Sequence, residues 1–160
     1  MDKVIRLLPS RDALGILYNG EWEHRSPEYI LRGLTAEQAH ARIPMLPHTI
    51  SDLLSHMQYW QDRRLELSRG EVSLPEDFQF GITDFPDVDP AGWEEQVSHF
   101  LATLAELQEL GGNEAALEAI VFDDRDIGMV IASHALHNSY HLGQIVTMRQ
   151  LLGVWPPVEG

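Results

Sequence analysis

The segment from Ile127 to Met148 contains no Asp, Glu, Lys or Arg. A run of this length could cross a membrane, but it carries three histidines, two carboxamides and several hydroxyl groups, each costly in hydrocarbon. A helix that its neighbours contact on most sides explains such a run better. We therefore expect a long last helix, capped by Asp126 and ending near Leu152, at the centre of a helical protein.

The rest of the chain also has the three- and four-residue apolar spacing of helices, and no sustained alternation of polar and apolar residues that would predict strands. Its 160 residues suffice for one domain, residues 1–160. The predicted fold is all-α, a bundle of about four main helices with short additional helices. The expected helices cover about Ser10–Tyr18, the residues after Ser26, a turn opening at Thr35, Thr49 to Gly70, Asp89 to Gly111, about Asn113–Ala119, and Asp126 to Leu152.

The segment between the second and third main helices, residues 70–90, is a long loop rich in Pro, Asp and Phe. Structureless loops of more than roughly a dozen residues are often functional, so this loop is a candidate part of a site. Trp22, Trp60, Tyr140 and Trp155 are candidates for the walls of a pocket, although core packing is the commoner role of such residues.

Composition limits the partners of the chain. A formal net charge of −14 argues against binding to nucleic acid or to anionic lipid, both of which need clustered Lys and Arg. The chain has no cysteine, which excludes disulfides, thiolate ligands and a cysteine nucleophile. The first residues show no export signal, so we expect a cytoplasmic protein with no membrane partner.

Three histidines of the uncharged run, His134, His137 and His141, fall in one sector of the expected helix and point toward the core. Burying an imidazole without a partner costs on the order of 1–3 kcal/mol, so a metal ion or a hydrogen-bond network must satisfy them. Two histidines four residues apart on a helix can coordinate one metal ion, which selects His137 and His141 as a ligand pair. His134 lies about 10 Å along the axis from His141 and is expected to support the site or to be a satisfied core residue.

A third donor must come from elsewhere, and His56 lies on the buried edge of another long helix. His24 is a weaker candidate, and His48 lies about 12 Å from His56 along a helix. His40 and His99 are expected to be ordinary, partly exposed side chains. A lone histidine pair at this spacing is more often structural than metal-binding, so both interpretations stay open on the residues alone.

Two stretches together, HTISDLLSHMQYW (48–60) and HALHNSYHLGQI (134–145), resemble the DinB-like, YfiT-like superfamily of four-helix bundles. The resemblance covers most of the chain, including GLTAEQA at 33–39 and the loop after RLELSRGE. It implies that His56, His137 and His141 bind one divalent metal ion in a pocket between helices. It also implies a homodimer, whereas the family name does not imply DNA binding.

Three neutral histidines leave a coordination position open for water or for a small-molecule substrate, as in catalytic metal sites. Zinc or nickel is the first expectation for an all-histidine site, and iron, manganese or copper are further options. The resemblance implies transfer reactions that use a low-molecular-weight thiol, which suits a chain without cysteine.

Metal-dependent hydrolysis is the alternative, and a non-catalytic metal-binding or structural module is a third possibility. The sequence HNSYH lacks the glutamate base of the H-E-x-x-H proteases. Asp123, Asp124 and Glu23 are weak candidates for a base, since carboxylates are abundant here and are usually solvated. Gln144 is a candidate hydrogen-bond partner for a ligand histidine.

Overall fold

The structure is a computed structural model, and it describes residues 16–20, 23–71, 74–122 and 124–158. The described part of the chain is mostly helical, as predicted. Residues 16–19 are helical, and the part of the expected first helix before them lies outside the described residues. The elements that follow are α2 (Pro27–Leu31), α3 (Ala36–Ala39), α4 (Ile50–Ser68), the 3₁₀ helix η1 (Pro90–Gly92), α5 (Trp93–Leu110), α6 (Glu114–Leu117), β1 (Ile120–Phe122), β2 (Arg125–Asp126) and α7 (Ile127–Leu151).

The helix starts follow the capping residues that the sequence predicts. The side chains of these residues accept hydrogen bonds from backbone N–H groups of the first helical turn, which have no partner within the helix. Thr49 and Asp52 form a reciprocal capping box at the start of α4. The other caps are Ser26 at α2, Thr35 at α3, Asp89 at η1 and Asp126 at α7. Gly70, with a φ of 77°, follows the end of α4 in the left-handed conformation that glycine adopts without strain.

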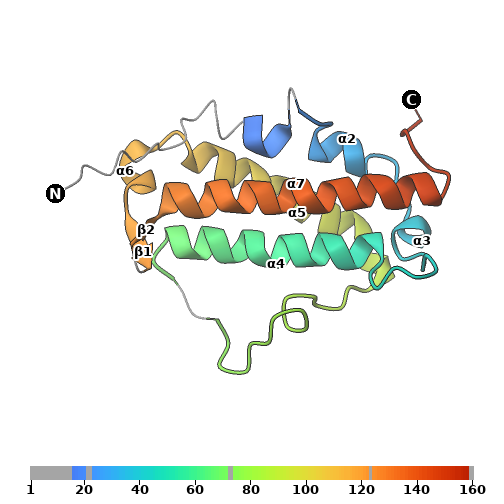
Figure 1. Ribbon diagram of the computed structural model, residues 1–160, viewed down its shortest axis with the longest axis horizontal. Helices are drawn as coiled ribbons and strands as arrows, with labels where there is room; N and C mark the ends of the chain where they lie inside the picture. The colour runs from blue at the N-terminus through green and yellow to red at the C-terminus, as the bar shows by residue number, and fades with distance from the viewer. Residues whose placement is uncertain (1–15, 21–22, 72–73, 123, 159–160) are drawn as a thin grey trace.

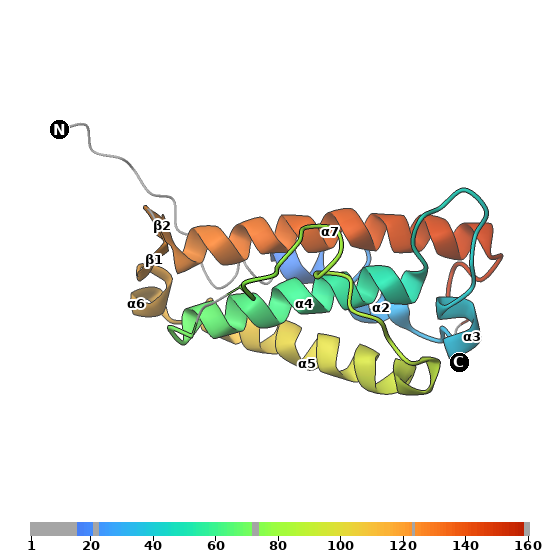
Figure 2. The same cartoon turned by 90° about the horizontal axis from the view of Figure 1, so that it is seen from below.

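Three long helices, α4, α5 and α7, lie side by side, and α7 runs antiparallel to α4 (Figures 1 and 2). The short helix α2 packs against both α7 and α5. The core between them contains fully buried side chains from each long helix, among them Leu54, Met57, Phe100, Leu107, Ile131 and Ile145. None of the described helices has both the length and the apolar character of a transmembrane span.

The direction of the helices explains why the loop between α4 and α5 is long. These two helices run in the same direction, so the chain must return along the length of α4, about 28 Å, before α5 begins. The returning loop passes over α4 and α7, as Figure 2 shows. The loop therefore lies against the two helices that carry the predicted metal ligands.

A small strand pair was not predicted. β1 and β2 form a two-stranded antiparallel sheet immediately before α7. The strands contain three and two residues, which is too short for an alternating pattern to be recognised in the sequence.

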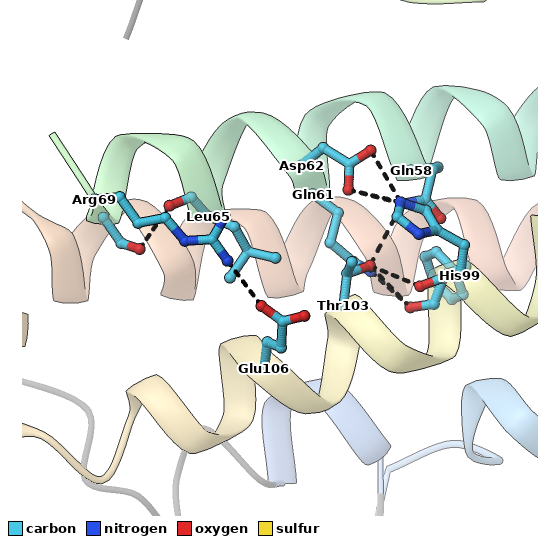
Figure 3. Close-up of polar contacts among 10 residues, drawn as sticks. Gln58, Gln61, Asp62, Leu65, Arg69, His99, Thr103 and Glu106 are labelled. Atoms are coloured by element: carbon cyan, nitrogen blue, oxygen red, sulfur yellow. Dashed lines mark hydrogen bonds and ion pairs between the residues drawn. The ribbon is translucent and has the colours of Figure 1, made fainter. Parts of the chain in front are cut away.

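A buried carboxamide fixes the register of the three long helices. The side chain of Gln61 on α4 donates to the carbonyl of Phe100 at 2.7 Å and lies 2.6 Å from Thr103 Oγ1, both on α5. Its oxygen accepts a hydrogen bond from Asn138 on α7 at 3.1 Å. Figure 3 shows this contact between α4 and α5, with the ion pair of Arg69 and Glu106 further along it. Because Asn138 follows His137, these bonds also fix the position of α4 relative to the histidines of α7.

Candidate metal centre

Three imidazole nitrogens from two helices converge on one point. The Nε2 atom of His137 on α7 lies 3.0 Å from Nε2 of His56 on α4 and 3.1 Å from Nε2 of His141. One ligand atom from each of the three residues lies within 4.8 Å of the other two. Two nitrogens bound tetrahedrally to one zinc ion, at about 2.0–2.1 Å each, are about 3.3 Å apart. The structure thus brings the three predicted residues to the spacing of ligands around one ion.

The partners of the outer ring nitrogens decide which nitrogens face inward. Nδ1 of His56 lies 2.8 Å from the backbone carbonyl oxygen of Asp84, and Nδ1 of His141 lies 2.6 Å from Oε1 of Gln144. Both partners are acceptors, so each Nδ1 must carry the proton that it donates. The Nε2 atoms of His56 and His141 consequently present lone pairs toward His137, as metal-ligating histidines do.

In this arrangement the three Nε2 atoms do not have enough protons to satisfy all of their lone pairs. A neutral His137 has one ring proton, so its Nε2 can donate to only one of the two facing lone pairs. If its proton is on Nδ1 instead, three lone pairs face one another. Nδ1 of His137 is buried and has no hydrogen-bond partner among the described residues. One cation at the point of convergence would satisfy all three Nε2 atoms at once.

Burial keeps these histidines in the neutral form that binds metals. Removal from water lowers the pKa of His56, His137 and His141, because it disfavours the charged imidazolium. The pKa of His137 falls to about 4, and repulsion from His141 and His56 contributes to that shift. At neutral pH no proton has to leave these rings before a metal binds.

The long loop positions His56 through Asp84. This aspartate is buried, and its Oδ2 lies 3.5 Å from Nδ1 of His56 in addition to the contact through its carbonyl. Its carboxylate also accepts hydrogen bonds from the backbone N–H of Gly81 at 2.6 Å and from the indole N–H of Trp60 at 3.1 Å. Asp84 therefore joins the loop to α4 and orients His56 at the same time.

Phe85 provides a second support from the loop. Its ring stacks on the ring of His56 with centroids 4.2 Å apart, and on the ring of His48 at the same distance. The contact holds the imidazole of His56 in one plane. His48 stacks on Phe85 but is not one of the converging residues.

The other histidines have separate partners. His134 is buried, and its Nδ1 lies 3.2 Å from the hydroxyl oxygen of Tyr18, so it is a core residue beside the site. His24 contacts the hydroxyl of Ser139 at 3.0 Å, His40 contacts the carbonyl of Ala36, and the exposed His99 pairs with Asp62. None of them belongs to the converging group.

The candidate bases are exposed or lie outside the described residues. Asp123 is outside the described residues. Asp124 is exposed in the turn before α7, and His137 lies about 15 Å along the axis from the start of that helix. Glu23 is exposed in the turn after residue 20. Gln144, in contrast, contacts a predicted ligand as expected.

A pocket opens next to the histidines, between α4 and α7 and under the loop. Its volume is about 340 Å³. It is lined by His56, Trp60, Arg64, Phe80, Asp84, Ser133, His134 and His137. A larger hollow of about 680 Å³ lies between the C-terminal ends of α4 and α5 and contains none of the histidines. The smaller pocket therefore gives a molecule a route to the histidines.

Comparison of the chain with protein-family models, curated proteins and solved structures gives no match. The geometry of the site is consequently the basis for its function. That geometry includes Asp84 and Phe85, which sequence reasoning missed. Only the length of their loop indicated a functional role.

Proposed function

We propose that the chain binds one divalent cation through the Nε2 atoms of His56, His137 and His141. The observation that carries this proposal is the convergence of three nitrogens, two of which present lone pairs because their other ring nitrogens donate to Asp84 and Gln144. Three neutral imidazoles suit zinc or nickel best, and iron or manganese are further options.

We further propose that the chain is a DinB-like four-helix bundle. In this proposal α4, α5 and α7 are three of its members, and the helical segment that includes residues 16–19 is the fourth. The order of the two histidine motifs and the position of His56 opposite His137 support the proposal.

We infer that the centre belongs to an enzyme for a small-molecule substrate, most consistent with transfer chemistry that uses a low-molecular-weight thiol. A cation held by three histidines would stabilise the thiolate form of a thiol, or lower the pKa of a water molecule, at its open position. The chain has no cysteine, so the thiol must come from a separate molecule, and the pocket gives it a route. Hydrolysis has less support because Asp84, the only carboxylate among the described pocket residues, already accepts two N–H donors.

Cobalt substitution tests whether the site accepts a thiol. Protein loaded with Co²⁺ and titrated with 2-mercaptoethanol should develop a charge-transfer absorption band from thiolate to cobalt. The matched thioether, 2-(methylthio)ethanol, should produce no such band because its sulfur carries no proton and cannot form a thiolate. A cobalt-loaded protein whose spectrum does not respond to saturating thiol would contradict the thiol proposal and leave a closed, structural metal site.

We propose that the protein is a homodimer that pairs through an exposed face of α7. The face carries large apolar side chains at helical spacing, Met129, Leu136, Tyr140 and Leu151, with Leu136 64% and Tyr140 66% exposed. Leu136→Asp should convert the dimer to a monomer in sedimentation velocity, because it places a charge in the apolar contact. Val158→Asp is the control, since Val158 is exposed outside this face. A monomeric wild-type protein would refute the proposal.

A further inference from the structure

Arg64 differs from its neighbour Arg63 on α4 and from Arg69, which follows the helix. None of the ion pairs among the described residues includes Arg64, and its Nε, like that of Arg63, is buried without a hydrogen-bond partner among these residues. The neighbouring Arg63 pairs with Glu66 at 2.8 Å, and Arg69 pairs with Glu106 at 2.9 Å. The chain has 25 acidic and 11 basic residues, so a shortage of carboxylates does not explain an unpaired arginine.

The position of Arg64 places its charge in the pocket beside the metal centre. It lies two turns after His56 on α4, about 12 Å along the axis, and lines the same pocket as His56 and His137. Burial lowers the pKa of Arg64, and the positive charge of Arg64 contributes to lowering the pKa of His134. The part of the pocket around Arg64 is thus positive, and no ion pair among the described residues neutralises it. A half-buried guanidinium without an anionic partner is in an unfavourable position, which an anionic ligand would relieve.

Aromatic rings form the wall between the two ends of the pocket. Trp60 lies between His56 and Arg64 on α4, and its ring stacks on Phe80 with centroids 5.8 Å apart. The guanidinium of Arg64 lies 5.0 Å from the centroid of the Trp60 ring. Phe80 is 76% exposed, so a large part of this wall faces solvent. Such a wall suits a flat, apolar molecule.

We propose that the pocket binds a small molecule with a carboxylate at one end and an apolar or aromatic body. The guanidinium of Arg64 holds the carboxylate, and Trp60 and Phe80 contact the body. Guanidinium binds carboxylates through paired hydrogen bonds, which makes it a strong and selective anchor. This proposal depends on the proposed metal centre in one respect only: the reacting end of the bound molecule would lie at His56 and His137.

A pair of probes that differ in charge tests the anchor. 3-Phenylpropionate and 3-phenylpropionamide are titrated into ¹⁵N-labelled protein, and dissociation constants are obtained from the shifts of the tryptophan indole N–H signals. Wild-type protein should bind the carboxylate at least about tenfold more tightly than the amide, which corresponds to one charge-assisted hydrogen bond. Arg64→Gln should remove this preference and leave the affinity for the amide unchanged.

Arg63→Gln is the matched control, because it removes a charge from the next residue of the same helix and should keep the preference. Arg64→Lys retains the charge and should keep part of it, which separates loss of charge from misfolding. Equal affinities for the two probes, binding of neither, or a preference that survives Arg64→Gln would overturn the inference.

The same titration on chelator-treated protein separates the two proposals. A preference that persists without metal and depends on Arg64 supports the anchor, even if the metal proposal fails. If the preference for the carboxylate disappears on chelation but is unchanged by Arg64→Gln, the carboxylate binds the metal. That result would overturn the proposal that Arg64 binds the carboxylate.

Discussion

Replacing His137 with alanine should lower the affinity of the protein for a divalent cation by more than about 100-fold. Loss of a residue that only orients a metal ligand typically lowers the metal affinity about 10–100-fold. Loss of a residue that binds the metal directly should lower it further. His137 should give the largest loss of the three, because its Nε2 lies between those of His56 and His141. Competition with a chromophoric chelator measures the affinity, and elemental analysis of the purified variant measures the occupancy.

Two further variants calibrate this result. Gln144→Ala leaves the three Nε2 atoms in place but removes the acceptor that orients His141, so its loss should fall within about 10–100-fold. His99→Ala removes an exposed histidine of α5 that pairs with Asp62 at the contact between α4 and α5 (Figure 3), and should leave the affinity unchanged. If His137→Ala binds metal as tightly as the wild type, the three residues are not the ligands.

The metal-free protein should lose stability as the pH falls below about 6.5. Desolvation is the main cause of the lowered pKa of His134, which lies well below its ordinary value, and the charge of Arg64 adds to it. The unfolded chain binds a proton at this residue near pH 6.5 and the folded protein does not. The folded state is therefore stabilised fully above pH 6.5, and this stabilisation is lost as the pH decreases toward the folded-state pKa.

The expected slope is about 1.4 kcal/mol in the free energy of unfolding per pH unit for each proton that the unfolded chain binds in excess. His56, His137 and His141 also have lowered pKa values and add to the slope of the free energy of unfolding against pH. For His137 this contribution extends from about pH 6.5 down to about pH 4. Urea denaturation at several pH values measures it. His134→Gln removes one titrating group and should reduce the slope by about one proton. An unchanged slope in this variant would show that His134 is not a source of the acid sensitivity.

The local structure of the protein follows closely from its sequence. Thr49, Asp126 and the other predicted caps begin their helices as expected, because capping depends on residues within one turn. The pairing of His137 with His141 follows from their spacing on one helix. The position of His56 opposite them could be predicted from its place beside the apolar stripe of α4.

The parts that could not be predicted depend on the path of the loop between α4 and α5. Neither the contact of Asp84 with His56 nor the stacking of Phe85 has a local signature, because each joins residues far apart in the chain. The sequence also could not show that no ion pair among the described residues includes Arg64, since any of the many carboxylates could have been its partner. Such contacts are decided by tertiary packing and not by local periodicity.

The central claim is that three imidazoles from α4 and α7 surround one cation, and X-ray absorption spectroscopy at the edge of the bound metal tests it most directly. For zinc-loaded protein the account predicts three imidazole nitrogens at about 2.0–2.1 Å, with the outer-ring scattering that identifies histidine. His137→Ala should reduce the imidazole count or abolish loading. A first shell made of oxygen atoms, without scattering from imidazole rings, would contradict the account.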